Sequence, residues 1–132
     1  MDCVFCKIIS GEIPGQKVWE DDKYAAFLDL FPYRLGQTIV MPKKHQSSYA
    51  FGLADNDLAG LTLAAKTVGR KLDTVLGAVR TCMLYEGFGV DHVHAKLYPI
   101  QPEEKMEGLV PLGTKAGEEE LEKLADKIRK EG

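Results

Sequence analysis

The sequence has few cysteines, no long apolar stretch and no run of basic residues. Three cysteines among 132 residues are an odd number and too few for a fold held together by disulfides. This low count favours a reducing cytoplasmic compartment. No segment approaches the roughly 20 consecutive apolar residues of a membrane-spanning helix. The first residues, which include the charged Asp2 and Lys7, lack the basic flank and apolar core of a secretory signal. We therefore expect a cytoplasmic protein that does not enter a membrane.

The balance of charges argues against a general nucleic-acid coat protein. Lys and Arg number 17 against 20 Asp and Glu, which leaves a net charge of −3. Binding to a nucleic-acid backbone relies on clustered basic side chains, so we expect no nucleic-acid partner. With 45% hydrophobic and 28% charged residues, the chain has the composition of a soluble globular protein. Its length suits one domain over residues 1–132.

The pattern of apolar residues predicts an α+β fold. The expected strands have β-branched or alternating apolar residues between turn residues, and they are 17–20, 24–30, 37–41, 80–86 and 92–100. The expected helices, in which apolar residues recur every three or four positions, are 55–76 and 118–130. Asp55, Asn56 and Asp57 offer side-chain oxygens to cap the long helix, and Gly77 ends it. Strands, helix, strands and helix in this order are typical of an antiparallel sheet.

Two of the three histidines, His92 and His94, lie in one short segment and are followed by Lys96 and Tyr98. Residues two apart share a face of a strand, so these four side chains are expected to point one way, away from the core. Two imidazoles beside an ammonium group suit a phosphate ligand, because a neutral imidazole has a lone pair that can attack phosphorus. A nearby Lys helps to keep that imidazole neutral. A solvated strand face without any site is the alternative interpretation.

Cys3 and Cys6 have the spacing of two ligands of one tetrahedral metal ion. Structural zinc usually takes four ligands, and His45 and His92 are available as the other two. A redox-active pair and two inert cysteines are the alternatives, although the sequence lacks the βαβ pattern expected around a thioredoxin-type pair. Cys82, in the middle of an expected strand, is interpreted as a small buried apolar residue.

Several separated motifs agree in order and spacing with one known family. They are Cys3–Ile9 with Gly11–Pro14, Val18–Asp22, Ala26–Asp29, Gly36–His45 and His92–His94. On these motifs the sequence resembles the histidine-triad (HIT) family over residues 1–101, and residues 102–132 lie outside the best match. The resemblance implies a HIT-like α+β fold, with a five-stranded antiparallel sheet, one long central helix and a C-terminal helix. It also implies a homodimer.

The resemblance further implies chemistry at the α-phosphate of a nucleotide. The expected substrates are purine nucleoside phosphoramidates or dinucleoside polyphosphates, hydrolysed or transferred through a covalent nucleotidyl-histidine intermediate. The attacking residue would be His94, with Lys96 and Gln37 at two further active-site positions. The nucleotide-binding residues implied in the same way are Phe5, Ile8, Phe27, Asp29, Gly89 and Val90. Among these, Asp29 would accept hydrogen bonds from the ribose, whereas the three large apolar residues have core packing as their alternative interpretation.

The same resemblance implies one structural zinc ion per chain, bound by Cys3, Cys6, His45 and His92. This ligand set agrees with the spacing of the two cysteines. A histidine bound to zinc cannot carry protons, so His94 alone among the histidines would remain for covalent chemistry.

Two active-site positions depart from the family pattern, because Lys96 and Gln37 stand where histidine is expected. Gln37 can donate a hydrogen bond but cannot change its charge near neutral pH, and Lys96 can hold phosphate but is a poor proton donor unless its pKa is lowered. The loop before His92 is short and lacks the Gln and Ser that relatives place around the phosphate. The sequence therefore predicts a slow nucleotidyl hydrolase or transferase. The alternatives are a nucleotide-binding or interaction protein with little catalysis, and a zinc-stabilised domain without a nucleotide role.

Overall fold

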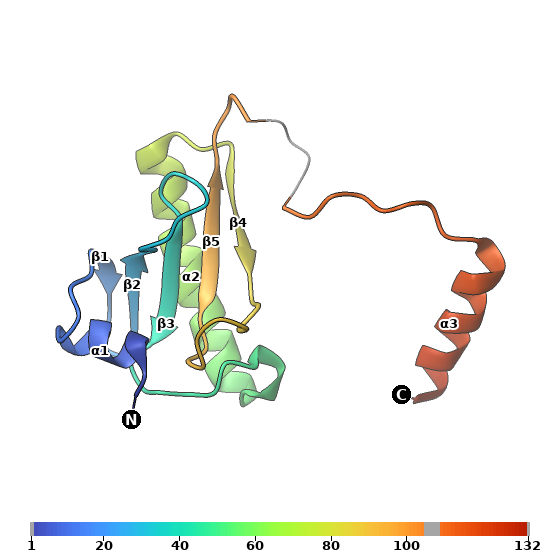
Figure 1. Cartoon of the computed structure of the whole chain (residues 1–132), viewed down its shortest axis with the longest axis horizontal. Coiled ribbons are helices and arrows are strands. Elements are labelled where there is room, and N and C mark those ends of the chain that lie inside the picture. Colours follow the sequence, from blue (N-terminus) through green and yellow to red (C-terminus); the bar gives the residue numbers. More distant parts are fainter. Residues whose placement is uncertain (1, 105–108, 132) are drawn as a thin grey trace.

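The structure is a computed structural model that describes residues 2–104 and 109–131. Its strands form one antiparallel sheet in the order β1-β2-β3-β5-β4, and they are β1 (Lys17–Glu20), β2 (Tyr24–Leu28), β3 (Thr38–Pro42), β4 (Arg80–Leu84) and β5 (Ala95–Ile100). The helices are α1 (Val4–Ser10), the 3-10 turn Ala50–Gly52, α2 (Asp55–Leu76) and α3 (Glu118–Glu131). The α+β fold with a five-stranded antiparallel sheet, a long central helix and a C-terminal helix is confirmed (Figure 1).

The long helix α2 packs along one face of the sheet (Figure 1). The core between them is made of small and branched apolar side chains: Ala26, Val40, Ala95 and Leu97 from the sheet, and Leu61, Ala64, Ala65, Val68 and Leu72 from α2. Gly60 lies within α2 where the hydroxyl of Tyr24 comes so close that a side chain would collide with it. Glycine weakens a helix by about 1 kcal/mol relative to alanine, so this close contact explains its place there.

The opposite face of the sheet is covered in part by α1. The second apolar cluster lies between them and contains Phe5, Ile8, Ala25, Phe27, Ile39 and Met41. Further along this face, β5 contributes Lys96 and Tyr98 to a cavity described below. Ala95 and Leu97 point the other way, into the core against α2. The alternation predicted for this part of the sequence is therefore confirmed.

The pattern of the sequence does not predict α1, because seven residues contain too few turns for a recurring apolar face. The helix is stabilised at both ends instead. The Sγ atom of Cys3 accepts a hydrogen bond from the backbone N–H of Cys6 (3.3 Å), and Gly11 ends the helix in a left-handed conformation with φ 85°. Phe5 and Ile8 are buried beneath it. A capping thiol and two buried side chains thus hold a helix that would be marginal alone.

The strand expected over 92–100 begins only at Ala95, so that prediction is wrong at its start. The backbone N–H groups of His92 and Val93 donate to carbonyl groups in loops, at 2.9 Å each, and not to a neighbouring strand. Both His92 and His94 are buried. Their burial contradicts the alternative interpretation of a solvated strand face.

Other expected boundaries need smaller corrections. The strands expected at 24–30 and 80–86 each end two residues earlier. The N-cap residue of α2 is Ala54, which has no side-chain acceptor, so the expected cap by an acidic or amide side chain is wrong. The acidic residues lie in the first turn, where they favour the helix dipole. Gly77 ends the helix as predicted, with φ 64°, whereas Cys82 is only partly buried.

The helix α3 lies away from the sheet, at the end of an extended segment (Figure 1). Apolar residues recur along it as predicted, but Leu121, Leu124 and Ile128 are each more than half exposed. Neither α3 nor any other helix in the described part of the chain is long and apolar enough to cross a membrane.

Candidate functional site

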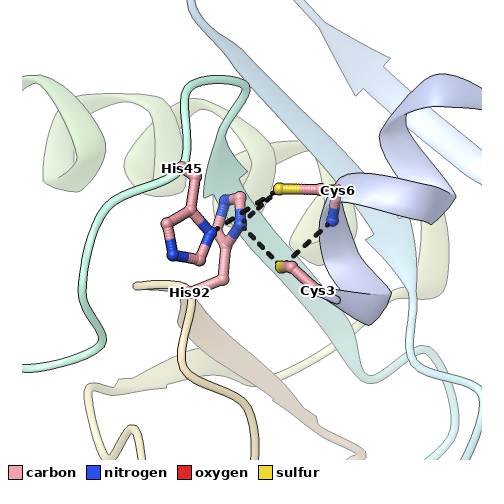
Figure 2. A group of neighbouring side chains, drawn as sticks. All are labelled: Cys3, Cys6, His45 and His92. Atoms are coloured by element: carbon pink, nitrogen blue, oxygen red, sulfur yellow. Dashed lines mark hydrogen bonds between the residues drawn. The ribbon is translucent and has the colours of Figure 1, made fainter. Parts of the chain in front are cut away.

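Four potential metal ligands from distant parts of the sequence meet at the N-terminal end of α1. They are Cys3, Cys6, His45 and His92, and their ligand atoms all lie within 4.8 Å of one another. The Nδ1 atom of His92 is 3.4 Å from Cys3 Sγ and 3.5 Å from Cys6 Sγ (Figure 2). His45 Nδ1 is 3.6 Å from Cys6 Sγ. In a tetrahedral zinc site the usual bond lengths place sulfur and nitrogen about 3.5 Å apart, so this donor set fits zinc.

A hydrogen bond at the far side of the ring orients His92 for this role. Its Nε2–H donates to the carbonyl oxygen of Pro42 at 2.8 Å, which leaves the lone pair of Nδ1 directed at the two thiols. Burial lowers the pKa of His92, and burial raises the pKa of Cys6. Without a cation, burial therefore favours the neutral imidazole of His92 and the protonated thiol of Cys6. A bound zinc ion would stabilise the thiolates and connect α1 to two loops.

The loop that carries His45 is tied to the residue before His92. The carboxylate Oδ1 of Asp91 accepts hydrogen bonds from the backbone N–H of Ser48 (2.9 Å) and from the hydroxyl of Ser47 (3.3 Å). These bonds link two loops that lie far apart in the sequence. They help to bring the two histidine ligands to one place.

Next to this cluster lies a cavity of about 650 Å³. It contains every residue that the sequence analysis assigned to nucleotide binding or catalysis, namely Phe5, Ile8, Phe27, Asp29, Gln37, Gly89, Val90, His94 and Lys96. Phe5, Ile8 and Phe27 also belong to the second apolar cluster. These three residues therefore pack in the core and line the cavity at the same time. A cavity of this volume is within the range of small-ligand sites.

His94 is held in one tautomer at the wall of this cavity. Its Nδ1–H donates to the backbone carbonyl of His92 at 2.7 Å, which leaves the lone pair on Nε2. Only 3% of the residue is exposed, and burial lowers its pKa, with a smaller contribution from the positive charge of Lys96. His94 is therefore a neutral imidazole with a free lone pair near pH 7, as a nucleophile requires.

Phe5 connects the two sites. Its ring meets the His94 ring edge-on with centroids 4.9 Å apart, and it meets the His92 ring at 6.0 Å. Because Phe5 lies in α1 between the two cysteines of the cluster, the position of α1 affects both the metal ligands and the cavity wall.

The cavity is lined by charged residues that the sequence predicted, such as Lys96, and by others that it did not. Lys96 lies 3.9 Å from Glu86, which also lines the cavity and was not among the expected site residues. Arg34 lines it as well and forms an ion pair with Glu104. No motif marks either residue: Arg34 lies in a loop, and Glu86 lies beyond the end of β4, although the expected strand 80–86 included it.

Gln37 lines the cavity in a way that the sequence did not suggest. The side chain is buried, its Nε2 donates to Asp29 Oδ2 at 2.6 Å, and its Oε1 accepts from the backbone N–H of Tyr33 at 2.9 Å. Both ends of the amide are thus bonded within the protein.

A family model described as the HIT domain matches residues 10–103 of the sequence. This chain belongs to the HIT family. The match includes the segments that carry His45, His92 and His94, and the two cysteines lie just before it.

Known proteins are similar to this chain over most of its length. It is 35% identical over 131 residues to adenosine 5′-monophosphoramidase HNT1 of Saccharomyces cerevisiae, covering 98% of this chain and 79% of HNT1. The crystal structure of SMU.412c from Streptococcus mutans matches with a TM-score of 0.83 at 31% identity, covering 98% of this chain and 85% of that one. A zinc-bound histidine triad family protein from Mycobacterium smegmatis matches with a TM-score of 0.71 at 26% identity, covering 86% and 85%.

Several bacterial HIT-like proteins match over shorter segments. In these, the matched segment spans 31% to 52% of the relative's length. The shared fold and family are therefore established, whereas activity, substrate and partners require an argument from the site itself.

Proposed function

We propose that the protein is a nucleotide hydrolase or transferase that acts at the α-phosphate of purine nucleoside phosphoramidates or dinucleoside polyphosphates. The observation that carries the proposal is the buried, neutral His94, whose free Nε2 belongs to the wall of a nucleotide-sized cavity. The yeast relative, named as an adenosine 5′-monophosphoramidase, supports the same class of substrate. The ligand would be a purine mononucleotide or a nucleotide conjugate.

The reaction would proceed in two displacements at phosphorus. In the first, the lone pair of His94 Nε2 forms a P–N bond while the bond between phosphorus and the leaving amine or phosphate breaks, and the leaving group takes the bonding electrons and a proton. In the second, water attacks the nucleotidyl-His94 and its P–N bond breaks, which releases the nucleotide and restores the histidine. The His92 carbonyl bonded to Nδ1–H stabilises the positive charge that His94 carries in between.

Lys96 supplies the positive charge at the phosphate. Its ammonium lies on the same side of β5 as the cavity and is partly exposed, 3.9 Å from Glu86. A lysine ammonium stabilises the negative charge of a phosphoryl group in the transition state but transfers a proton less readily than an imidazole near neutral pH. We therefore expect slow turnover with leaving groups that need a proton.

The experiment that tests the proposal measures AMP release from adenosine 5′-phosphoramidate by the wild type and by His94→Ala. The wild type is expected to release AMP, and the variant to lose at least about 10³-fold in rate, because the nucleophile is missing. AMP binding measured by calorimetry should persist in the variant. Absence of AMP release from the wild type would contradict the proposal.

A second candidate is a nucleotide-binding protein with little catalysis. The observation that favours it concerns the two residues that stand where the family pattern has histidine. Gln37 is bonded within the protein at both ends of its amide, and Lys96 pairs with Glu86. AMP affinity without turnover of any phosphoramidate or dinucleoside polyphosphate would select this candidate.

We also propose a structural zinc ion bound by Cys3, Cys6, His45 and His92. The distances between the donor atoms and the orientation of His92 by Pro42 support it, as does the zinc-bound relative from Mycobacterium smegmatis. The ion would crosslink α1 to the loops before α2 and β5. Elemental analysis of protein purified without added metal should give about one zinc per chain.

A homodimer in the cytoplasm is the remaining part of the proposal. β4 is an edge strand of the sheet, and both Met83 within it and Val79 just before it are exposed. An unpaired strand edge with apolar side chains nearby suits pairing with a second copy. Sedimentation of a monomer at micromolar concentration would contradict this assembly.

A further inference from the structure

We propose that Gln37 is a positioning residue that fixes the carboxylate of Asp29 for the ribose hydroxyls, and so determines a preference for ribonucleotides over nucleotides lacking these hydroxyls. The inference rests on the proposed function, since it assumes a nucleotide in the cavity. It assigns to Gln37 a role that differs from contact with the phosphate.

The first step is the burial and bonding of Gln37. Only 4% of the residue is exposed, so an unbonded amide there would be unfavourable. Its Nε2–H donates to Asp29 Oδ2 at 2.6 Å, a short bond of the kind made to a charged acceptor, and its Oε1 accepts from Tyr33 N–H at 2.9 Å. These bonds direct the amide to the loop 29–36 and to the carboxylate.

The second step is the restraint on Asp29. Its Oδ1 accepts from the backbone N–H of Phe31 at 2.9 Å, while its own N–H donates to the backbone carbonyl of Gln37 at 3.0 Å. With Oδ2 bonded to the Gln37 amide, the carboxylate is held at two points, and the backbone of Asp29 is held at a third. Each carboxylate oxygen accepts about two hydrogen bonds, so Asp29 keeps acceptor capacity in the cavity that it shares with His94.

The third step is what this restraint does for binding. A carboxylate that is already oriented binds a pair of sugar hydroxyls without the entropy loss of ordering a free side chain. A hydrogen bond to a charged acceptor changes affinity by about tenfold or more. Without the Gln37 amide, Asp29 loses one of its anchors, and the preference for the hydroxyls should fall. The affinity for a sugar without these hydroxyls should stay the same.

The experiment measures the dissociation constants of AMP and 2′,3′-dideoxy-AMP by calorimetry for the wild type and for Gln37→Leu. Leucine keeps the buried volume near that of glutamine but has no polar atoms. We expect the wild type to bind AMP at least about tenfold more tightly than the dideoxy analogue, and the variant to show less than about a threefold difference. The affinity for the dideoxy analogue should stay within about twofold.

Two further variants keep the test decisive. Gln37→Asn retains an amide that is one methylene shorter and cannot reach both Asp29 and Tyr33, so it should also lose the preference. This variant provides the test if Gln37→Leu does not fold. Gln101→Leu makes the same change at a partly buried glutamine that does not line the cavity, and it should retain the wild-type ratio.

The outcomes separate this inference from the proposed function. A ratio retained in the folded Gln37 variants, or equal weakening of both ligands, would overturn the role of Gln37. Binding of both ligands by the wild type without a preference would overturn it too, while leaving the nucleotide pocket intact. Failure of the wild type to bind either ligand would overturn both.

Discussion

The two faces of the sheet are built from different kinds of side chain. The face against α2 is a continuous apolar core, with residues such as Val40, Leu61 and Leu97 almost completely buried. At the other face, three buried polar residues, His92, His94 and Gln37, lie just outside the strands beside the second apolar cluster. Buried polar groups destabilise a fold unless they are hydrogen-bonded, and each of these three has a partner. One face therefore supplies most of the apolar packing, and the candidate site lies at the other.

Within the second face, His92 and His94 show how a partner decides the role of a residue. The two residues are chemically identical and two positions apart, and His94 donates to the carbonyl of His92. His92 donates through Nε2 and directs Nδ1 at two thiols, whereas His94 donates through Nδ1 and keeps Nε2 for the cavity. The backbone carbonyl that each ring meets selects its tautomer, and the tautomer decides which ring nitrogen keeps a free lone pair.

Among the changes that test the different roles of His92 and His94, the largest effect is expected from removing one residue of the ligand cluster. Cys6→Ser should abolish zinc binding and lower the free energy of unfolding by about 3 kcal/mol or more, because the ion would connect α1 to two loops. AMP affinity should fall too, since α1 carries Phe5 and Ile8 into the cavity wall. Elemental analysis, chemical denaturation and calorimetry measure the three effects.

The matched control for this variant is Cys82→Ser. Cys82 is also partly buried but lies in β4, outside the ligand cluster. This variant should keep its zinc and lose about 1 kcal/mol or less. A wild-type protein that is well folded without any metal would refute the four-ligand site.

A smaller effect is expected at Lys96. Lys96→His should raise the rate of AMP release from adenosine 5′-phosphoramidate by about tenfold or more, because an imidazole can protonate a leaving amine near neutral pH. Lys96→Met keeps the length of the side chain without its charge and should lower the rate instead. Steady-state kinetics at pH 7 compares the three proteins. An unchanged rate in the histidine variant would mean that leaving-group protonation does not limit turnover.

The smallest effects are expected in α2, where substituting two glycines by alanine should change the stability of the protein in opposite directions. A Cβ at Gly69 would lie 3.9 Å from Thr81 Cγ2, an ordinary contact, so Gly69→Ala should stabilise the protein by about 0.5–1 kcal/mol through helix propensity. Gly60→Ala would have to displace Tyr24 and should destabilise it by about 1 kcal/mol. Thermal unfolding compares both with the wild type, and equal shifts would show that the contact at Tyr24 is not tight. Neither variant should change zinc content.

The long helix α2 was predicted correctly because its pattern repeats many times, and the short strand β1 was also predicted correctly, at Lys17–Glu20. The apolar residues of α2 recur over 22 residues, and the helix spans Asp55–Leu76 as expected. The short helix α1 was not predicted: it has only seven residues, and its cap is the thiol of Cys3. The strand β5 begins only at Ala95, since the N–H groups of His92 and Val93 donate to carbonyl groups outside the sheet.

The candidate site shows the same division. The spacing of Cys3 and Cys6 indicates a metal pair, and motif order assigns His45 and His92 to it. Nothing in the local sequence, however, gives the loop contacts that bring these four residues within reach of one another. The sequence also places Gln37 near the active site, but only the structure shows that its amide bonds to Asp29 and Tyr33.

The sequence alone determined the residue types, the alternation of faces and the family, because these depend on local periodicity and on motif order. The tertiary structure decided the tautomers of His92 and His94, the partners of Gln37 and the shared contact of Phe5 with both histidine rings. The physical reason is that a hydrogen bond or a ligand set depends on distances of a few ångströms between groups as many as 89 residues apart. Such distances exist only after the chain has folded around its two apolar clusters.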